Sequence, residues 1–342
     1  MPSINFSVCS LSLPMVKKYQ LFARKNFKSS GYQFNFNYLK HLYLENPFSE
    51  GMSDCRIILK KEADQSEVVG CIHNITSILT PSNTMFKSIK FSGIHNLMVD
   101  KDNLGIGYKL LSDVIRRHKN FYVPGVVGDL NNFYLKIGAK QLTNIWHRKF
   151  VISNFFQSVL RIRGIKISHS LLAKFQKKYL SADIQLHYER SDKLVNIISN
   201  ELDSIDLPKL SLEYIFWRIF GTNNPDKQTF ILTLDQDYAV FSIGCRKYFP
   251  ILRLIYVSKR SSGNAKLLTN TIVPIARAFG AIGIFSTSDN LSVTQQLQAL
   301  KFKELQNSPK SYFYSKDYDN FYTPHWPMMG DHGFDEFFTS DQ

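Results

Sequence analysis

The sequence predicts an α/β protein with two tandem units, each a mixed, largely antiparallel twisted sheet flanked by helices. Each half of the chain contains three successive runs rich in β-branched and aromatic residues, followed by a small-residue turn and a helical pattern. In each half, strand, helix and strand patterns then follow in the same order. The chain has 342 residues, of which 44% are hydrophobic, so it can form about two domains with sizeable cores.

The first unit is expected to occupy residues 1–151. Its strand patterns lead into a joint at Gly105 and Gly107, after which an amphipathic helix runs to about residue 118. The other expected helices cover 15–28, 36–44 and 131–139. The expected strands cover 56–60, 67–76, 94–99, 121–128 and 146–152, and the last of these closes the unit.

The second unit is expected to occupy residues 211–316 and repeats the order of elements without obvious sequence identity. Its helical patterns cover 211–221, 259–280 and 291–302, and its strand patterns cover 228–234, 238–247, 250–258, 281–287 and 311–316. Residues 152–210 form a basic helical connector. Residues 317–342 form a tail rich in aromatic residues and carboxylates, which we expect to pack on the body of the protein.

The connector has two interpretations. Among its lysines it places Leu171, Leu172, Phe175 and Tyr179 at helical spacing. A surface for acidic lipid or for a lipid-linked substrate would have this composition. The simpler interpretation is a helix that packs on the units and leaves a solvated lysine face.

The balance of charge favours anionic partners. Lysine and arginine exceed aspartate and glutamate by 42 − 28 = 14, and the pI is near 9.4. The positive residues are spread along the chain, and no helix-turn-helix, zinc-finger or RNP-type aromatic motif is present. This pattern argues against a nucleic-acid-binding protein. A solvated basic surface without a specific partner has the same composition.

Cysteine and histidine give no sign of a metal site. Cys9, Cys55, Cys71 and Cys245 are far apart, and the nine histidines are scattered, so we expect neither metal ligands nor a disulfide framework. The N-terminus lacks the pattern of a signal peptide, and no apolar run approaches the roughly 18 residues of a membrane helix. We therefore expect a cytoplasmic protein.

The glycine joint is suited to anion binding. The first backbone N–H groups of a helix lack internal partners, and glycines allow a phosphate to approach them, so Leu104–Gly107 can hold a pyrophosphate. Ser262–Ala265 can do the same in the second unit. A dinucleotide motif would have a third glycine where the chain has Leu110, and a nucleotide-triphosphate loop would have Gly-Lys-Ser/Thr. A plain tight turn is the remaining alternative.

In its context the joint resembles the pyrophosphate loop of the GNAT superfamily of acyl-CoA N-acyltransferases. That loop reads Gln/Arg-x-x-Gly-x-Gly/Ala and binds coenzyme A through backbone amides. The two glycines of the joint fit, whereas Asp102 departs from the first position. The later Y-x-K-x-G-F signature matches Tyr134 and Gly138, with Ala139 in place of the phenylalanine.

The second unit resembles the same family at different positions. Arg260, Gly263 and Ala265 all fit the loop, but Leu297 and Lys301 replace the tyrosine and the glycine of the later signature. We expect the first unit to be the catalytic one, because it combines two glycines with the tyrosine. The alternative is that the second unit binds the coenzyme and the first has diverged.

The chain as a whole resembles tandem GNAT-type proteins of bacterial surface-polysaccharide clusters. The similar segments are "LYLENPF", "VVGCI", "YIFWRIFG" and the ending "HWPMMGDHGFDEFF". The resemblance implies an acyl-CoA-dependent N-acyltransferase, most simply one that uses acetyl-CoA and no metal. It further implies a small amine acceptor such as an amino sugar, nucleotide- or lipid-linked.

The chemistry assigns roles to residues near the joint. Aminolysis of a thioester needs donors for the developing oxyanion and a proton for the leaving thiolate. Backbone N–H groups near Leu97–Val99 would polarise the carbonyl, and the resemblance implies that Tyr134 protonates the thiolate, although a core aromatic residue fits the same pattern. The residues expected at the coenzyme are Leu97, Met98, Val99, Leu104, Gly105, Ile106, Gly107 and Asn131 in the first unit and Arg260, Gly263 and Ala265 in the second.

A carboxylate is expected to receive the proton of the amine. Asp331 and Asp335 of the tail are candidates, and Asp331 is preferred, because the apolar tail around it is suited to packing into a cleft. Glu45 and Asp129 are the other candidates, and a solvated surface charge is the simpler reading of each.

Two other functions fit the same sequence. One is a non-catalytic GNAT-like module that binds nucleic acid or acidic membrane through its basic surface. The other is a two-domain transferase that uses aminoacyl-tRNA. The acceptor, the acyl length and the oligomeric state are not indicated by the residues.

Overall fold

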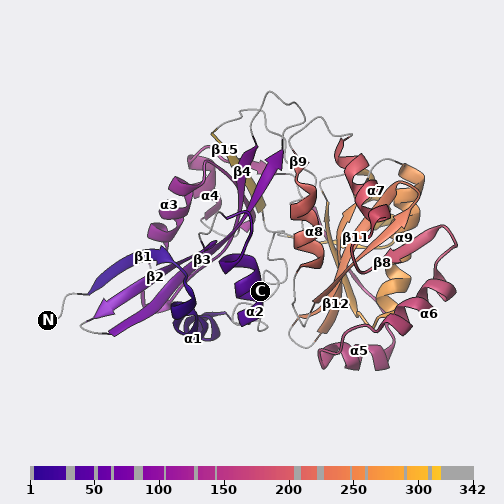
Figure 1. Cartoon of the computed structure of the whole chain (residues 1–342), viewed down its shortest axis with the longest axis horizontal. Coiled ribbons are helices and arrows are strands. Elements are labelled where there is room, and N and C mark those ends of the chain that lie inside the picture. The colour runs from indigo at the N-terminus through magenta and orange to yellow at the C-terminus, as the bar shows by residue number, and fades with distance from the viewer. Residues whose placement is uncertain are drawn as a thin grey trace. The chain divides into compact units, whose positions relative to one another are not determined.

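The structure of the chain is a computed structural model (Figure 1). It describes residues 4–27, 35–49, 53–62, 65–80, 88–103, 105–126, 130–142, 145–203, 209–221, 227–246, 249–258, 261–288, 291–306 and 310–316. These residues form two compact units, which are described separately below. Unit 1 contains the residues up to 141 together with 311–316, and unit 2 contains residues 142–310.

Unit 1 is a mixed sheet with helices on both faces. Its strands follow the order β1 (Asn5–Ser10), β2 (Cys55–Glu62), β3 (Gln65–Thr80), β4 (Ile89–Val99), β5 (Asn120–Val126), β15 (Lys310–Ser315) and β6 (Lys140–Leu142). The first four strands are joined by antiparallel pairing, and β4 and β5 are parallel. This arrangement is the mixed, largely antiparallel sheet that the sequence predicts.

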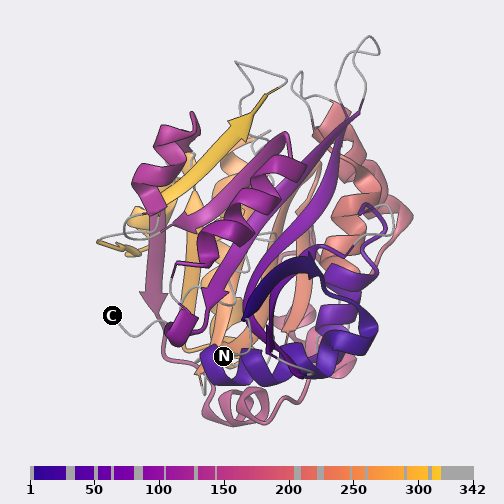
Figure 2. The ribbon, with the colours of Figure 1, turned by 90° about the vertical axis from the view of Figure 1, so that its left-hand side faces the viewer.

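The helices of unit 1 divide between the two faces of this sheet. They are η1 (Leu13–Met15), α1 (Val16–Asn26), α2 (Phe36–Leu39), the π-helical turn η3 (Lys40–Leu44), η4 (Lys101–Asn103), α3 (Gly107–Arg117) and α4 (Leu130–Lys136). Helix α3 buries Leu110, Leu111 and Val114 against strand residues such as Ile72, and Figure 2 shows it lying over the strands. Side chains alternate along a strand, so the neighbouring His73 faces the other side, where it meets α1.

Unit 2 repeats this plan. Its strands follow the order β14 (Lys303–Glu304), β7 (Ile145–Phe150), β13 (Gly283–Ser288), β12 (Phe249–Val257), β11 (Asp237–Arg246), β10 (Lys227–Leu234) and β8 (Ile184–His187). Its helices are α5 (Phe155–Ile162), α6 (His169–Tyr179), α7 (Asp192–Asp203), α8 (Leu212–Phe220), α9 (Ser262–Ala278) and α10 (Leu291–Ala299), and a short strand β9 covers Lys209–Leu210. Here β12 and β13 are the parallel pair, which corresponds to β4 and β5 in unit 1.

Two strands belong to a different sheet from the one that the sequence predicts. The strand predicted at 146–152 to close the first unit is β7, which pairs with β13 over six residue pairs. The strand predicted at 311–316 to end the second unit is β15, which lies between β5 and β6. A local pattern specifies that a segment is extended, but tertiary packing selects its neighbours. Strands β1, β6, β8, β9 and β14 were not predicted, and β8 and β9 lie in the segment that was expected to be a helical connector.

The connector is part of unit 2 and does not form a separate layer. Leu172 and Phe175 of α6 are buried in the core of that unit, and Leu171 packs against it. Tyr179 stacks on Phe175 at a ring distance of 5.0 Å and is half exposed. The apolar stripe of α6 is therefore mostly core, as the simpler interpretation of the connector states.

Candidate active site

The end of β4 separates from its parallel neighbour. The parallel register joins Ser92 with Phe121 and Gly93 with Tyr122, whereas β3 accompanies β4 as far as Val99. The β3–β4 register also shifts in this region, where Asn96 adopts a φ of 51°. A bulge of this kind bends a strand, so β4 diverges from β5 after Gly93, and this divergence is called the opening between β4 and β5 below. Leu97, Met98 and Val99 lie on this stretch, and their role as donors to a thioester carbonyl stays a prediction.

A buried cluster of rings supports the bulge. The amide nitrogen of Asn96 lies 3.1 Å from Nδ1 of His73, and Nε2 of His73 is hydrogen-bonded to the Tyr19 hydroxyl at 2.7 Å. The Tyr43 ring stacks on His73 with centroids 4.4 Å apart. Burial, followed by the nearby His95, lowers the pKa of His73 well below its usual value, so the ring is neutral at neutral pH. We assign this cluster to holding the bulge.

His95 has a defined tautomer in the same cluster. Its Nδ1 lies 3.2 Å from the carbonyl oxygen of Gly93, which can only accept, so Nδ1 carries the proton. Nε2 then accepts a hydrogen bond from the Tyr43 hydroxyl at 3.0 Å. Sequence reasoning missed both histidines. The available signal was the polar pair His95–Asn96 inside an otherwise apolar strand.

The glycine joint follows β4, and its two glycines have different roles. Gly105 has a φ of +94°, a conformation that residues with a side chain rarely adopt, while Gly107 begins α3. A Cβ at Gly107 would lie 3.1 Å from Cγ2 of Val99, so this glycine permits close packing of α3 on the end of β4. Ile106 directly precedes α3, Asp102 is exposed, and Leu104 lies outside the described residues.

The N-terminus of α3 is open to an anion. In the part of the joint that the structure describes, no side chain caps α3, and its first turn carries no acidic residue. The backbone N–H groups at a helix N-terminus and the helix dipole favour a bound phosphate at this position.

The corresponding helix of unit 2 is closed by the protein itself. The buried carboxylate of Asp237 accepts hydrogen bonds from the Ser258 hydroxyl at 2.6 Å and from the Ser261 backbone N–H at 3.4 Å. It also accepts from the side-chain amide of Asn264 at 3.1 Å, and Ser261 caps α9 by accepting from the Asn264 N–H. An incoming phosphate would meet this carboxylate. Gly263 lies in the first turn of α9, Ala265 is buried in the core, and Arg260 is outside the described residues.

Tyr134 lies in α4 within the core of unit 1. Its ring stacks on Tyr312 with centroids 5.5 Å apart and meets Phe133 edge-on. The Tyr134 hydroxyl is protonated at neutral pH, and burial raises its pKa further above the usual value. The Tyr312 hydroxyl donates to Oδ1 of Asn131 at 3.0 Å. The packing suits a core residue and the protonation suits an acid, so the catalytic role of Tyr134 stays a prediction.

Of the four carboxylates predicted as candidate bases, the structure describes Glu45. Glu45 is exposed and pairs with Lys40 at 3.2 Å, as a solvated surface charge does. Asp129, Asp331 and Asp335 lie outside the described residues.

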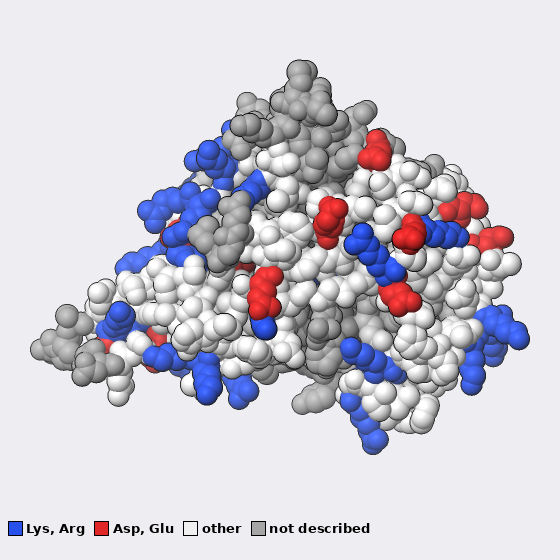
Figure 3. All heavy atoms as spheres, in the orientation of Figure 1, with Lys and Arg blue, Asp and Glu red and all other residues white. Residues whose placement is uncertain are grey.

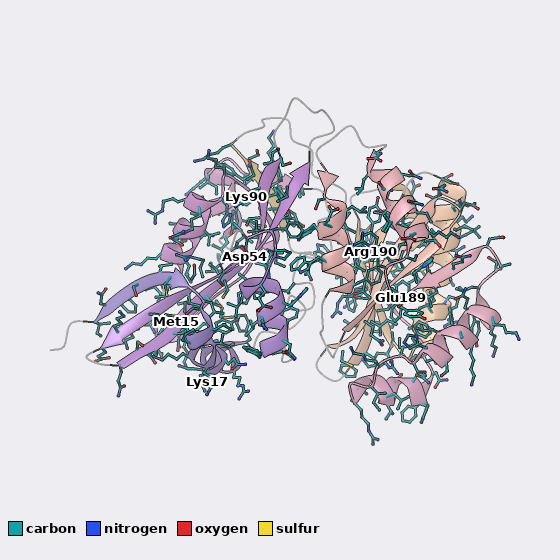
Figure 4. All side chains as sticks on the ribbon, viewed as in Figure 1. Met15, Lys17, Asp54, Lys90, Glu189 and Arg190 are labelled. Carbon is teal, nitrogen blue, oxygen red and sulfur yellow. The ribbon has the colours of Figure 1, made fainter. Side chains whose placement is uncertain are left out.

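A polar cavity of about 650 Å³ lies at the other end of α3. Its lining comes from β1–β5, the end of α3 and nearby loops: Ser10, Ser49, Ser53, Asp54, Arg56, Asn74, Thr76, Ser88, Ile89, Lys90, Arg117, His118, Lys119 and Asn120. Figure 4 labels Asp54 and Lys90 on unit 1. Arg56 and Arg117 share one carboxylate, that of Asp113, at 2.7 and 3.1 Å, so the wall has a surplus of positive charge. A cavity of this size and charge suits a small anionic molecule.

Two titratable groups face each other across Asn74 in the cavity wall. Asp54 accepts hydrogen bonds from Asn46, Asn74 and Thr76, yet burial raises the pKa of its carboxyl to about 6. His118 lies 3.4 Å from the Asn74 amide nitrogen, and burial, followed by Arg117, lowers its pKa to about 4. At neutral pH the carboxyl is therefore mostly ionised and the imidazole is neutral.

Replacing His118 by glutamine is expected to change the pH dependence of stability. The pKa of His118 is lower in the folded protein than in the unfolded chain, so the stability that it contributes is present above about pH 6.5 and lost toward pH 4. Asp54 acts oppositely: its raised pKa contributes stability at low pH that is lost as the pH rises through about 6. On going from about pH 6.5 to 4.5, His118→Gln should gain about 2 kcal/mol relative to wild type.

Urea denaturation of both proteins at the two pH values measures this difference. If the wild-type and His118→Gln proteins change in parallel, the imidazole is solvated and the assigned burial is wrong.

The part of the chain that the structure describes offers neither a metal site nor a membrane-spanning helix. No group of three or more His, Cys, Asp or Glu side chains among them could hold a metal ion. No helix in the described ranges is both long and apolar enough to cross a membrane.

The fold resembles that of known acyltransferases. No protein-family model matches the sequence, and no curated protein matches it either. N-myristoyltransferase from Saccharomyces cerevisiae, solved with bound myristoyl-CoA, superposes with a TM-score of 0.60 at 11% identity, over 94% of this chain and 80% of that chain. A GCN5-related N-acetyltransferase from Anabaena variabilis superposes with a TM-score of 0.53 at 12% identity, over 90% and 72%. This chain therefore has the two-domain GNAT fold, with one mixed sheet in each unit.

Proposed function

We propose that this protein is an acyl-CoA-dependent N-acyltransferase that acetylates a small amine, with the coenzyme bound in unit 1. The observation that carries the proposal is the opening between β4 and β5 beside the uncapped N-terminus of α3. The opening would take the pantetheine arm and the helix would take the pyrophosphate. The structure of the yeast protein with bound myristoyl-CoA supports an acyl-CoA donor. The self-capped α9 favours unit 1 over unit 2.

The proposed reaction balances without a metal. The neutral amine attacks the thioester carbonyl carbon, and backbone N–H groups of Leu97–Val99 stabilise the oxyanion. As the intermediate collapses the C–N bond remains and the C–S bond breaks, and the Tyr134 hydroxyl gives its proton to the thiolate. A carboxylate of the tail, Asp331 or Asp335, receives the proton that leaves the nitrogen.

The acceptor is proposed to carry an anionic group. The cavity begins at Lys90 and Asn120, the N-terminal ends of the two strands that separate farther along. Its cationic wall and its serine hydroxyls suit a phosphate-bearing, hydroxylated molecule. A nucleotide- or lipid-linked amino sugar, made in the cytoplasm for a surface polysaccharide, has this chemistry.

Replacing Gly105 by alanine is expected to weaken acetyl-CoA binding about tenfold or more. A side chain at a φ of +94° costs about 1–2 kcal/mol, and relief of that strain would turn the joint's N–H groups away from the phosphates. Titration calorimetry with acetyl-CoA measures the change. Gly263→Ala should bind normally, because its Cβ would meet only the Ser261 hydroxyl, at 3.8 Å. If Gly263→Ala weakens acetyl-CoA binding and Gly105→Ala does not, the coenzyme binds in unit 2.

The same calorimetry tests the proposed function and the acyl length. Acetyl-CoA and myristoyl-CoA are titrated into the full chain, and acetyl-CoA is expected to bind at least as tightly. Absence of heat and of thermal shift with both would contradict the transferase proposal. Steep salt dependence of binding to unrelated DNA, or copurifying tRNA, would then favour the non-catalytic module or the aminoacyl-tRNA-dependent enzyme.

A further inference from the structure

Unit 2 exposes large apolar side chains along one short segment. Phe150, Ile152, Phe155 and Phe156 are 74%, 91%, 82% and 66% exposed, and Ile162 and Ile165 are each about half exposed. We call these six residues the α5 patch. Isolated exposed hydrophobic residues are normal on protein surfaces, but six within one segment form the kind of surface that binds another apolar phase.

Helix α5 is turned so that its polar residues face the protein. Its buried residues are Ser158 and Arg161. The Ser158 hydroxyl donates to the carbonyl oxygen of Gly280 at 2.8 Å, and the backbone N–H of Asn154 donates to the carbonyl oxygen of Arg277 at 3.0 Å. These contacts fix α5 on the end of α9 and leave Phe155 and Phe156 outside. The exposure of the aromatic rings therefore follows from how α5 is anchored.

The chain around the α5 patch is strongly basic. From residue 148 to residue 182 it contains eight lysines and arginines and no aspartate or glutamate. In Figure 3 the surface around α5 carries blue side chains. A second copy of the chain docked on this surface would bring these like charges together, which disfavours association. A bilayer with anionic headgroups offers apolar chains for the rings and negative charge for the lysines and arginines.

We infer that the α5 patch docks unit 2 on the surface of an anionic lipid bilayer. The aromatic and isoleucine side chains enter the boundary between headgroups and acyl chains, and the surrounding cations contact lipid phosphates. This surface lies mostly within the connector, residues 152–210, that the sequence offers as a surface for acidic lipid, but outside its apolar stripe on α6. The stripe on α6 is mostly buried, whereas the α5 patch lies upstream of it.

Vesicle co-sedimentation of the full chain tests the inference. We expect binding to vesicles of phosphatidylcholine mixed with phosphatidylglycerol, weaker binding to phosphatidylcholine alone, and release by salt. The double variant Ile152→Ser, Phe155→Ser should bind the mixed vesicles about tenfold more weakly or worse. Arg163→Gln with Lys166→Gln should lose the preference for anionic vesicles.

Leu267→Ser is the matched control. Leu267 is 52% exposed on α9 of the same unit, in the half of the helix away from the Arg277 contact with α5, so its loss should leave vesicle binding unchanged. Thermal denaturation of each variant confirms that it is folded. Equal binding by wild type and the double variant, or no binding by wild type, would overturn the inference. So would a dimer that the double variant dissociates, because the patch would then join two copies.

Discussion

Gly280→Ala is expected to lower the free energy of unfolding of unit 2 by about 3 kcal/mol. Gly280 has a φ of +84°, and a Cβ there would lie 2.4 Å from the carbonyl carbon of Gln157 and 2.4 Å from the backbone nitrogen of Ser158. The left-handed conformation costs an L-residue about 1–2 kcal/mol, and overpacking against backbone costs about 1–3 kcal/mol more. Backbone atoms cannot move aside as the end of a flexible side chain can.

The Cβ of an alanine at position 280 would displace α5, which contains Gln157 and Ser158. Gly280 lies between the end of α9 and Ala281, which is fully buried, so it cannot retreat without disturbing the core. Urea denaturation measures the loss. Gly263→Ala is the control, because its Cβ would meet an ordinary contact at 3.8 Å and alanine favours the helix. Equal stability of both variants would show that α5 is not seated on Gly280.

Local sequence predicted the elements of this fold better than their partners. The repeated order of strands and helices could be predicted from the sequence, because alternation and helical spacing depend only on neighbouring residues. Residues 146–152 and 311–316 were correctly predicted as strands but were placed in the wrong sheet. Each sheet contains a strand from the opposite half of the chain, and no local pattern carries that information.

The candidate site was predictable where a single residue type is required. Gly105 stands at a positive φ, which only glycine adopts easily, so the joint could be found from the sequence. The contact of His73 with Asn96 joins two strands 23 residues apart and depends on a bulge, so it could not be found in this way. Likewise, "NFFQSVLRI" predicts a helix but not which of its faces is buried, and Phe155 therefore gave no signal of its exposure.

Tyr134→Phe is expected to lower turnover about a hundredfold or more while acetyl-CoA affinity stays near that of wild type. The substitution keeps the ring that stacks on Tyr312 and removes only the hydroxyl. That hydroxyl is protonated at neutral pH, as an acid for the leaving thiolate must be, although burial raises its pKa and so makes it a weaker donor. Loss of a general acid typically costs a factor of this size.

Tyr312→Phe is the matched control, because it removes the other hydroxyl of the same stacked pair. It breaks the hydrogen bond to Asn131, so it should cost about 1 kcal/mol of stability and leave turnover nearly unchanged. Steady-state kinetics and thermal denaturation of both variants separate the roles. If Tyr134→Phe loses stability and turnover together, its hydroxyl serves the core. If its turnover is unchanged, the thiolate takes its proton from water, and the second unit around Arg260 and Gly263 becomes the candidate to examine.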